Sequence, residues 1–326
     1  MTDTTIHTQR FIIPILSKDS TIDIPLHVFV SEVNLSSSTI SPLVVLFHGA
    51  GGDHYHFDKV VPVLVRSGFR VLTCDLRYHG ESQPTVKENN VVFDMGTLCQ
   101  DIFQVLLWLK EHHYNHTKED KEKINCDLIF GGLSMGSILA QVCADQPTTK
   151  WESLGYTLRG MIMIASTSIH MIWPRIAWMD LYRDIESLDA AVLQAARQAI
   201  TESAIHEDAK KEVARAMALI TDQTLFLSLR ACANSLAVPL LLNDEEQEQK
   251  PQFDDYPIRL PKQLLITGQA DEHTVHITTA LKSLNDGEGI KDTVLRIIQN
   301  SGHMVPLDQG VEVGNAIVDM FYNNEK

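Results

Sequence analysis

The amino-acid sequence predicts an α/β fold: a mostly parallel, doubly wound sheet of eight strands that is interrupted by a block of helices. Continuous apolar runs of strand length, typical of strands buried on both faces, alternate with amphipathic helical segments. The alternation stops at about Thr167 and resumes at Gln263. One α/β core with a helical insertion is the simplest arrangement that accounts for both observations.

The strand-like segments are short, rich in branched apolar residues and bounded by polar or Gly-containing turns. They are Phe11–Leu16, Ile24–Val30, Leu43–Phe47, Phe69–Cys74, Cys126–Phe130, Met161–Ala165, Gln263–Thr267 and Thr293–Ile298. Helical segments lie between them, with apolar residues at steps of three and four. They are Phe57–Arg66, which Gly68 closes, Asp94–Glu111, a segment from Ser134 that stops before Pro147, Val275–Leu284 and Asp308–Phe321.

The interruption has a helical pattern throughout, from about Thr167 to Asn243, and no strand is expected there. Its three amphipathic segments are Ser187–Ile200, His206–Ile220 and Gln223–Leu236. The charged run Asp244–Lys250 that follows is typical of a solvated connector. We therefore predict a core of residues 1–166 and 256–326 and a helical insertion of residues 167–255.

The composition excludes several classes of function. Asp and Glu number 42 against 27 Lys and Arg, a formal net charge of −15, which argues against binding to nucleic acid or to an anionic membrane surface. The same charge favours a neutral or apolar substrate over an anionic one. No apolar run is long enough to span a bilayer, and we expect no secretory signal at the N-terminus. Five widely spaced cysteines without a C-x-x-C motif indicate a reduced protein, so we expect a cytoplasmic location.

The strongest motif is Gly132-Leu133-Ser134-Met135-Gly136, which lies between a buried strand and a helix. In that context G-x-S-x-G forms a nucleophile elbow, a sharp turn that exposes the serine at the end of the strand. The two glycines leave room for the turn, and the helix N-terminus favours a developing negative charge. The motif predicts that Ser134 is a catalytic nucleophile.

A serine nucleophile needs a base, and the base needs an acid that orients it. On a sheet of this kind both partners follow the serine in the sequence, acid first, at the ends of later strands. Asp271 follows the strand Gln263–Thr267, and His303 follows the strand Thr293–Ile298. They are the predicted acid and base, with Glu272 as the alternative acid and helix capping as an alternative role for Asp271.

An oxyanion hole requires two backbone N–H groups about 3 Å from the reacting oxygen. The amide of Met135, directly after the nucleophile, is one candidate. The turn after the Leu43–Phe47 strand, which continues as Gly49-Ala50-Gly51-Gly52, offers the other. We assign this role to Ala50, with Gly49 allowing the close approach of the substrate. His48 is expected to brace the turn rather than to act as a second base.

Together these residues resemble the α/β-hydrolase fold superfamily, and the resemblance covers residues 11–322. Asp75–Ser82 is similar to the D-x-R-G-x-G-x-S segment of that superfamily and departs from it at Tyr78. The resemblance implies that Asp75 and Arg77 brace loops beside the site and are not catalytic.

The resemblance is to the serine branch that contains a cap, the esterase-like and lactonase-like enzymes. Epoxide hydrolases and haloalkane dehalogenases carry Asp where Ser134 stands, so those branches are excluded. The insertion, Thr167–Asp255, corresponds to the cap, which in this superfamily usually covers the site. Met171, Trp173 and Trp178 at its start are therefore candidate substrate-binding residues, with packing inside the cap as the alternative.

The predicted function is hydrolysis of an ester, thioester or lactone of a small, largely apolar molecule. A C–C bond hydrolase, an acyltransferase or a perhydrolase would use the same triad, and a ligand-sensing receptor could retain a slow one. No cofactor and no metal site are predicted. His112 and His116 have a metal-ligand spacing but lack a third partner, and a solvated helix end is the preferred interpretation. The sequence leaves the oligomeric state open.

Overall fold

The computed structural model describes residues 5–16, 23–33, 41–84, 92–112, 126–172, 189–236, 252–253, 262–287 and 292–322. Its centre is an eight-stranded sheet with the strand order β1-β2-β4-β3-β5-β6-β9-β10. The strands are β1 (Ile6–Leu16), β2 (Asp23–Val33), β3 (Leu43–Phe47), β4 (Arg70–Cys74), β5 (Cys126–Leu133), β6 (Tyr156–Ile164), β9 (Gln263–Gly268) and β10 (Thr293–Ile298). The pairs β1–β2 and β2–β4 are antiparallel and the other pairs are parallel, which confirms the predicted fold class.

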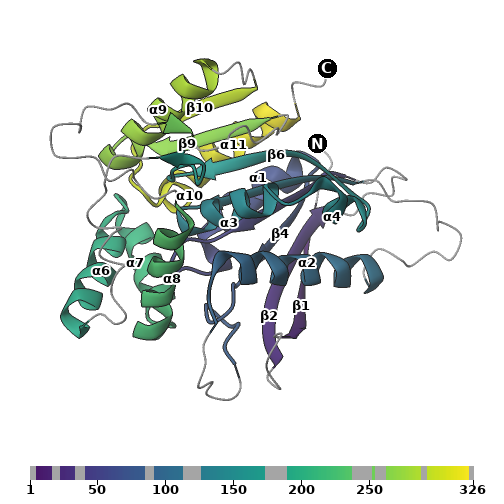
Figure 1. Cartoon of the computed structure of the whole chain (residues 1–326), viewed down its shortest axis with the longest axis horizontal. Helices are drawn as coiled ribbons and strands as arrows, with labels where there is room; N and C mark the ends of the chain where they lie inside the picture. Colours follow the sequence, from purple (N-terminus) through teal and green to yellow (C-terminus); the bar gives the residue numbers. More distant parts are fainter. Residues whose placement is uncertain are drawn as a thin grey trace, which may run out of the picture.

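Helices cover both faces of the sheet (Figure 1). They are α1 (Val61–Arg66), α2 (Met95–His112), α3 (Met135–Ala144), α4 (Thr148–Glu152), α9 (Glu272–Gly287), α10 (Val305–Asp308) and α11 (Gly310–Phe321). β3 is buried along its whole length, and its side chains alternate between the two cores. Val45 and Phe47 pack in the cluster that contains α2 and α3, whereas Val44 and Leu46 pack with α1 and α11.

Three more helices follow β6 in the sequence: α6 (Ala190–Glu202), α7 (Glu207–Met217) and α8 (Asp222–Ser235). They stand together beside one end of the sheet, at the lower left of Figure 1. β6 nevertheless pairs directly with β9, so the sheet continues across this interruption of the chain. The boundaries of core and insertion at residues 166/167 and 255/256 stay a prediction.

One expectation for the insertion is wrong. Met171–Ile172 lies inside the stretch expected to be helical throughout, yet it forms a short strand, β7. β7 pairs antiparallel with β8 (Gln252–Phe253), which follows that stretch. Such a pairing joins segments that are remote in the sequence, and local periodicity carries no signal for it. The charged run Asp244–Lys250 lies outside the described residues.

Two predicted helices are divided. A 3₁₀ turn, η1 (His54–Phe57), precedes α1, and Pro62 in the first turn of α1 lacks the N–H that would continue a helix from that turn. The C-terminal helix is divided at Gln309 into α10 and α11. A Cβ atom at Gly310 would come within 3.0 Å of the Lys59 side chain, so the chain there packs closely on the segment before α1. None of the described helices has both the length and the apolar character needed to cross a membrane.

Candidate active site

The predicted nucleophile elbow is present between β5 and α3. Ser134 has φ 52° and ψ −113°, a left-handed conformation that costs a non-glycine residue about 1–3 kcal/mol. A Cβ atom at Gly132 would come within 3.0 Å of the Gly136 backbone, and one at Gly136 would come within 3.0 Å of the Phe47 carbonyl oxygen. Both glycines are therefore required by the close packing of the turn, as the motif predicts. Ser134 itself stays half-buried.

The turn after β3 lies directly beside the elbow. Phe47 pairs in register with Gly132, so the two strands end at the same level of the sheet. A Cβ atom at Gly49 would lie 3.6 Å from the Cβ atom of Ser134. The N–H of Gly52 donates to the Gly49 carbonyl at 3.0 Å and closes the turn.

His48 braces this turn from below. The Gly49 carbonyl must accept, so His48 Nδ1 donates to it at 2.8 Å, and His48 Nε2 accepts from the Leu76 amide at 3.0 Å. Burial lowers the pKa of His48 to about 4, so the ring is neutral at physiological pH. Both ring nitrogens are occupied by backbone groups, in agreement with the expected bracing role.

The predicted acid and base form a pair. His303 Nδ1 lies 2.7 Å from Asp271 Oδ2. The Thr274 hydroxyl donates to the same carboxylate, and the Thr274 amide donates to it at 3.3 Å. Burial alone would raise the pKa of Asp271, but the hydrogen bonds from His303 and Thr274 hold it below its usual value. Glu272, the alternative acid, is exposed in the first turn of α9.

The structure brings these parts to one edge of the sheet as two halves. Ser134 and the β3 turn form one half, and Asp271 with His303 forms the other. The Ser134 amide donates to the Ile164 carbonyl at 2.9 Å, and the Ala165 amide donates to the Ile266 carbonyl at 2.8 Å, so adjacent strand ends are tied together. Within the described ranges no hydrogen bond joins Ser134 to His303, and such bonds often tighten only when a substrate is bound.

The two amides predicted to form an oxyanion hole have no acceptor in the described part of the chain. Met135 is the first residue of α3, and the first N–H groups of a helix have no intrahelical acceptor. Ala50 is in the turn beside the elbow, where its amide is not used in closing the turn. As far as the described residues go, both N–H groups are therefore available to donate to a ligand.

Trp173 and Trp178, two of the predicted substrate-binding residues, lie outside the described residues, and Met171 lies in β7. The structure identifies another residue at the site, Met217 of α7. A Cβ atom at Gly51 would come within 3.0 Å of the Met217 sulfur, so this side chain covers the β3 turn. No sequence signal indicates that contact, because the two residues come from remote parts of the chain.

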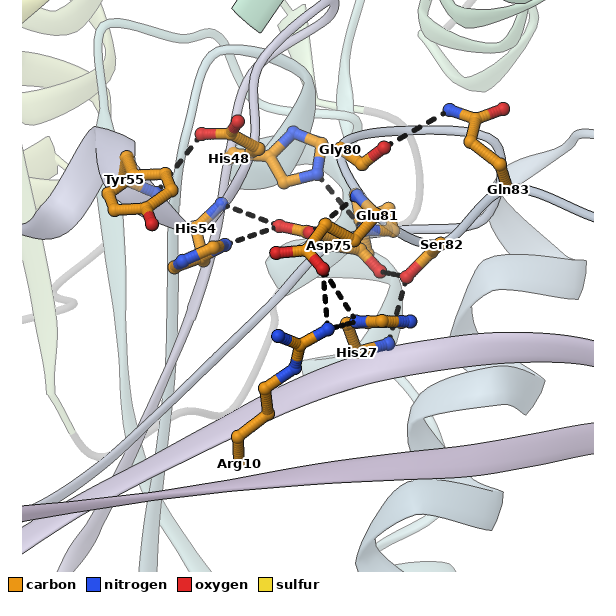
Figure 2. A network of polar contacts seen from close by, with 12 residues as sticks. Arg10, His27, His48, His54, Tyr55, Asp75, Gly80, Glu81, Ser82 and Gln83 are labelled. Atoms are coloured by element: carbon orange, nitrogen blue, oxygen red, sulfur yellow. Dashed lines mark hydrogen bonds and ion pairs between the residues drawn. The ribbon is translucent and has the colours of Figure 1, made fainter. Parts of the chain in front are cut away.

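Asp75 is the centre of a buried polar network beside the turn, shown in Figure 2. Its carboxylate accepts from the amide and Nδ1 of His54, at 2.9 and 2.7 Å, and from the Glu81 amide at 2.8 Å. Burial favours a raised pKa for Asp75, but these bonds lower it below the usual value. Arg77 forms a bidentate pair with the buried Asp101, at 2.7 and 2.6 Å. Asp75 and Arg77 thus brace loops, as expected.

Histidine, cysteine and carboxylate side chains do not gather in threes anywhere in the described ranges in a way that could hold a metal ion. This edge of the sheet presents a serine hydroxyl, an imidazole oriented by a carboxylate, and two backbone amides that have no acceptor among the described residues. That combination suits nucleophilic attack on a carbonyl group.

Comparisons with known proteins agree with the fold. A family model described as the alpha/beta hydrolase family matches residues 44–316. A search of curated protein sequences gives no match. Among solved structures, a thermophilic esterase from Thermogutta terrifontis is 17% identical, with a TM-score of 0.61 over 98% of this chain and 100% of that chain. MenH from S. aureus is 15% identical, with a TM-score of 0.62 over 92% of this chain and 99% of that chain.

The enol-lactonase from Burkholderia xenovorans LB400 is 15% identical, with a TM-score of 0.54 over 92% of this chain and 96% of that chain. At these identities the solved structures show the shared fold alone. The family model is a stronger statement because it spans most of the sequence, from β3 to α11. The chain belongs to the alpha/beta hydrolase family.

Proposed function

We propose that the protein is a serine hydrolase that cleaves an ester, thioester or lactone bond of a small, largely apolar substrate through an acyl-enzyme. One observation carries the proposal: the strained Ser134 stands at the sheet edge where Asp271 already orients His303. Strain of this kind persists only where the surrounding structure enforces it, and it concentrates at functional sites.

In the first step Ser134 Oγ attacks the substrate carbonyl and His303 Nε2 takes its proton. Asp271 holds the Nδ1–H of His303 at 2.7 Å, so in the neutral ring the lone pair is on Nε2. The imidazolium that then forms is stabilised by a carboxylate that is already ionised. Asp271 does not need to take up the proton itself.

The negative charge that develops on the carbonyl oxygen would be held by the amides of Ala50 and Met135. Both lack an acceptor among the described residues and flank Ser134 from the β3 turn and from α3. The N-terminus of α3 adds its partial positive charge at the same place. A single donor of this kind contributes on the order of 10²–10³ in kcat.

In the second step His303 returns its proton to the leaving group and then activates a water molecule. That water attacks the acyl group on Ser134, and the serine leaves with the proton from His303. Every proton therefore passes through Nε2 of one ring, and no further titrating group is required.

The proposal is tested with p-nitrophenyl esters and lactones of increasing chain length, together with a fluorophosphonate probe. We expect wild-type turnover with a burst of one equivalent of nitrophenol, and covalent labelling on Ser134. Ser134→Ala should lose labelling and at least roughly 10³-fold in kcat. Ser137→Ala is the matched control, since this buried hydroxyl three residues on in α3 has no hydrogen-bond partner in the described structure; it should label and turn over normally.

Four outcomes would replace the proposal. Equal hydrolysis by wild type and Ser134→Ala would show that the serine is not the nucleophile. Labelling at Ser134 without turnover of any ester would indicate a receptor with a slow triad. Fast cleavage of a vinylogous diketone with poor ester turnover would indicate a C–C bond hydrolase. Transfer of the acyl group to an added alcohol in preference to water would indicate an acyltransferase.

A further inference from the structure

Helix α7 contacts both halves of the proposed active site, one at each end. Its N-terminal end lies at the loop that carries His303, and its C-terminal end lies at the turn after β3. Between these ends, Ala209 and Val213 pack in the apolar cluster that contains α1 and α11, so the two polar contacts are not the only attachment of α7 to the core. The pair of contacts therefore calls for its own explanation.

At the N-terminal end, the carboxylate of Asp308 links α7 to the histidine loop. It accepts from the amides of Ile205 and His206, at 3.1 and 3.0 Å, and from the Gly302 amide at 2.9 Å. His206 is the N-cap residue of α7 and provides no side-chain cap of its own. The buried Asp308 thus supplies the acceptor and the negative charge that a helix N-terminus favours, from α10 instead of from the local sequence.

The backbone of the base is held in the same place. The His303 amide donates to the Ser203 carbonyl at 2.9 Å, just before α7 begins. A Cβ atom at Gly302 would come within 3.0 Å of that carbonyl oxygen, so the two segments are in close contact. His303 and the residue before it are both hydrogen-bonded at this junction, one to the segment leading into α7 and one to Asp308.

At the C-terminal end, Arg215 of α7 contacts the residue that follows the β3 turn. Arg215 Nη2 lies 2.6 Å from Asp53 Oδ2, and Asp53 is 1% exposed. Asp53 also caps η1 by accepting from the Tyr55 amide at 3.1 Å, and the Arg215 guanidinium lies over the Tyr55 ring. Two residues beyond Arg215, at the last residue of the same helix, Met217 covers Gly51.

We propose that α7 positions the histidine loop and the β3 turn as one unit, with Asp308 and Arg215 as the positioning residues. This rests on the proposed function, since it assigns roles relative to Ser134. Eleven residues of helix separate the two loops by about 16 Å, a stiff connection. Reacting groups must be held to within about 0.5 Å. Neither the histidine loop nor the β3 turn belongs to β5, the strand that ends just before Ser134, so other contacts must fix their positions relative to Ser134.

The alternative is that each contact only attaches the helix to the core. The two ideas differ in how the effects of two substitutions combine. Sites farther apart than about 10 Å with no shared partner give additive effects, unless something rigid connects them. Coupling through α7 therefore predicts a departure from additivity that attachment alone does not.

The test is a cycle of Asp308→Asn, Arg215→Gln and the double variant, with kcat and KM measured on one p-nitrophenyl ester. We expect each single variant to lower kcat roughly tenfold with KM nearly unchanged, because a small misplacement of reacting groups acts on the chemical step. The double variant should lose clearly less than the roughly 100-fold product, since α7 is already released from one loop. Arg215→Lys, which keeps the cation, should restore most of the kcat.

Lys211→Gln is the matched control on α7. It removes an exposed surface pair with Asp208, at 3.4 Å, and should leave kcat unchanged. Near-UV circular dichroism confirms that each variant is folded. If Asp308→Asn fails to fold, the Arg215 variants still decide the question, because Arg215 is on the surface and the readout below is at the other end of the helix.

The second readout does not need turnover. The proton between His303 Nδ1 and Asp271, whose heavy atoms are 2.7 Å apart, should give a downfield resonance in the proton NMR spectrum. Arg215→Gln should shift it although Arg215 contacts the other loop, and Lys211→Gln should not. An unshifted resonance, or a double variant at the full product of the single losses, overturns the coupling. If the wild type hydrolyses nothing, the proposed function fails while the resonance still decides the role of α7.

Discussion

Acidification should destabilise this protein well above the pH at which carboxylates titrate. Three histidines close to the β3 turn, His48, His56 and His79, are at most 1% exposed. Burial lowers the pKa of His48 to about 4 and the pKa of His56 and of His79 to about 3. Both ring nitrogens of His56 lack a hydrogen-bond partner in the described structure, so no acceptor stands ready for an added proton.

The direction in which stability changes with pH follows from the number of protons that the folded and unfolded states bind. In the unfolded chain these histidines have a pKa near 6.5, so below that pH the unfolded state binds protons that the folded state does not. The folded state is therefore fully favoured above about pH 6.5 and loses stability as the pH falls toward the folded values. At pH 5.5 each histidine accounts for a loss of somewhat more than about 1 kcal/mol relative to pH 7, and the three together for about 4 kcal/mol. A domain of ordinary stability has about 5–15 kcal/mol in total.

Buried carboxyl groups set the lower limit of the pH range in which the histidines dominate the loss of stability. Burial raises the pKa of Asp53 and of Asp101, despite the hydrogen bonds from Arg215 and Arg77. Such groups bind protons more readily in the folded state, so they oppose the histidines as the pH falls further. Measurements between pH 7.0 and 5.5 therefore report mainly on the histidines.

The assay is urea unfolding, followed by circular dichroism and tryptophan fluorescence at four pH values and constant ionic strength. The free energy of unfolding should fall by about 4 kcal/mol with an unchanged dependence on urea. His56→Phe should remove about a third of this loss and raise the stability at low pH. His112→Gln, at an exposed position, is the control. A fall of less than about 1 kcal/mol would show that these rings accept protons when folded and would refute the argument.

Three further predictions concern the braces around the site. Gly136→Ala forces a Cβ atom against the Phe47 carbonyl, and should lower the free energy of unfolding by about 3 kcal/mol in urea titrations. Arg77→Met leaves the buried Asp101 without its ionic partner and should cost about 3–5 kcal/mol, most of which a second change, Asp101→Leu, should restore; a double variant no more stable than the single one would contradict this. Thr274→Val removes a hydroxyl donor to the proposed catalytic acid, and steady-state kinetics should show kcat roughly tenfold lower, with Thr274→Ser near wild type.

Much of the fold is readable from the sequence because buried parallel strands are locally distinctive. β3 and β10 have the bounds predicted for them. β3 is a fully buried apolar run, whereas β10 is a partly exposed strand at the edge of the sheet, and a turn closes each of them. β6 extends farther than its apolar run, to Tyr156. β6 pairs with β9 only from Met161 onward. The part of β6 before Met161 therefore has β5 as its one partner strand, and the sequence of that part is more polar. The polar start of β6 therefore leaves a weaker pattern in the sequence than its enclosed, apolar end.

The residues of the site can be predicted from the sequence for a similar reason, but the contacts that hold them together cannot. Ser134, Asp271 and His303 each follow a recognisable strand, so their place at one edge of the sheet could be predicted. Asp308 and Arg215 act on that edge from helices, through contacts between residues about 100 and 160 positions apart. No periodicity or spacing encodes such pairs, because each is chosen by packing in three dimensions.

Strained backbone conformations are concentrated at the edge of the sheet where the proposed active site lies. Among the described residues, four that are not glycine have positive φ: Tyr78, Ser134, Ala165 and Asn300. Each follows a strand of the sheet, at the edge where the proposed site lies. Hydrogen bonds that continue the sheet beyond its strand ends support two of them, from Ser134 to β6 and from Ala165 to β9. Ser134 thus depends directly on β6, which precedes the inserted helices, and β6 in turn pairs with β9, which follows them. The strained conformation of the elbow is therefore supported by a sheet to which both sides of the insertion contribute.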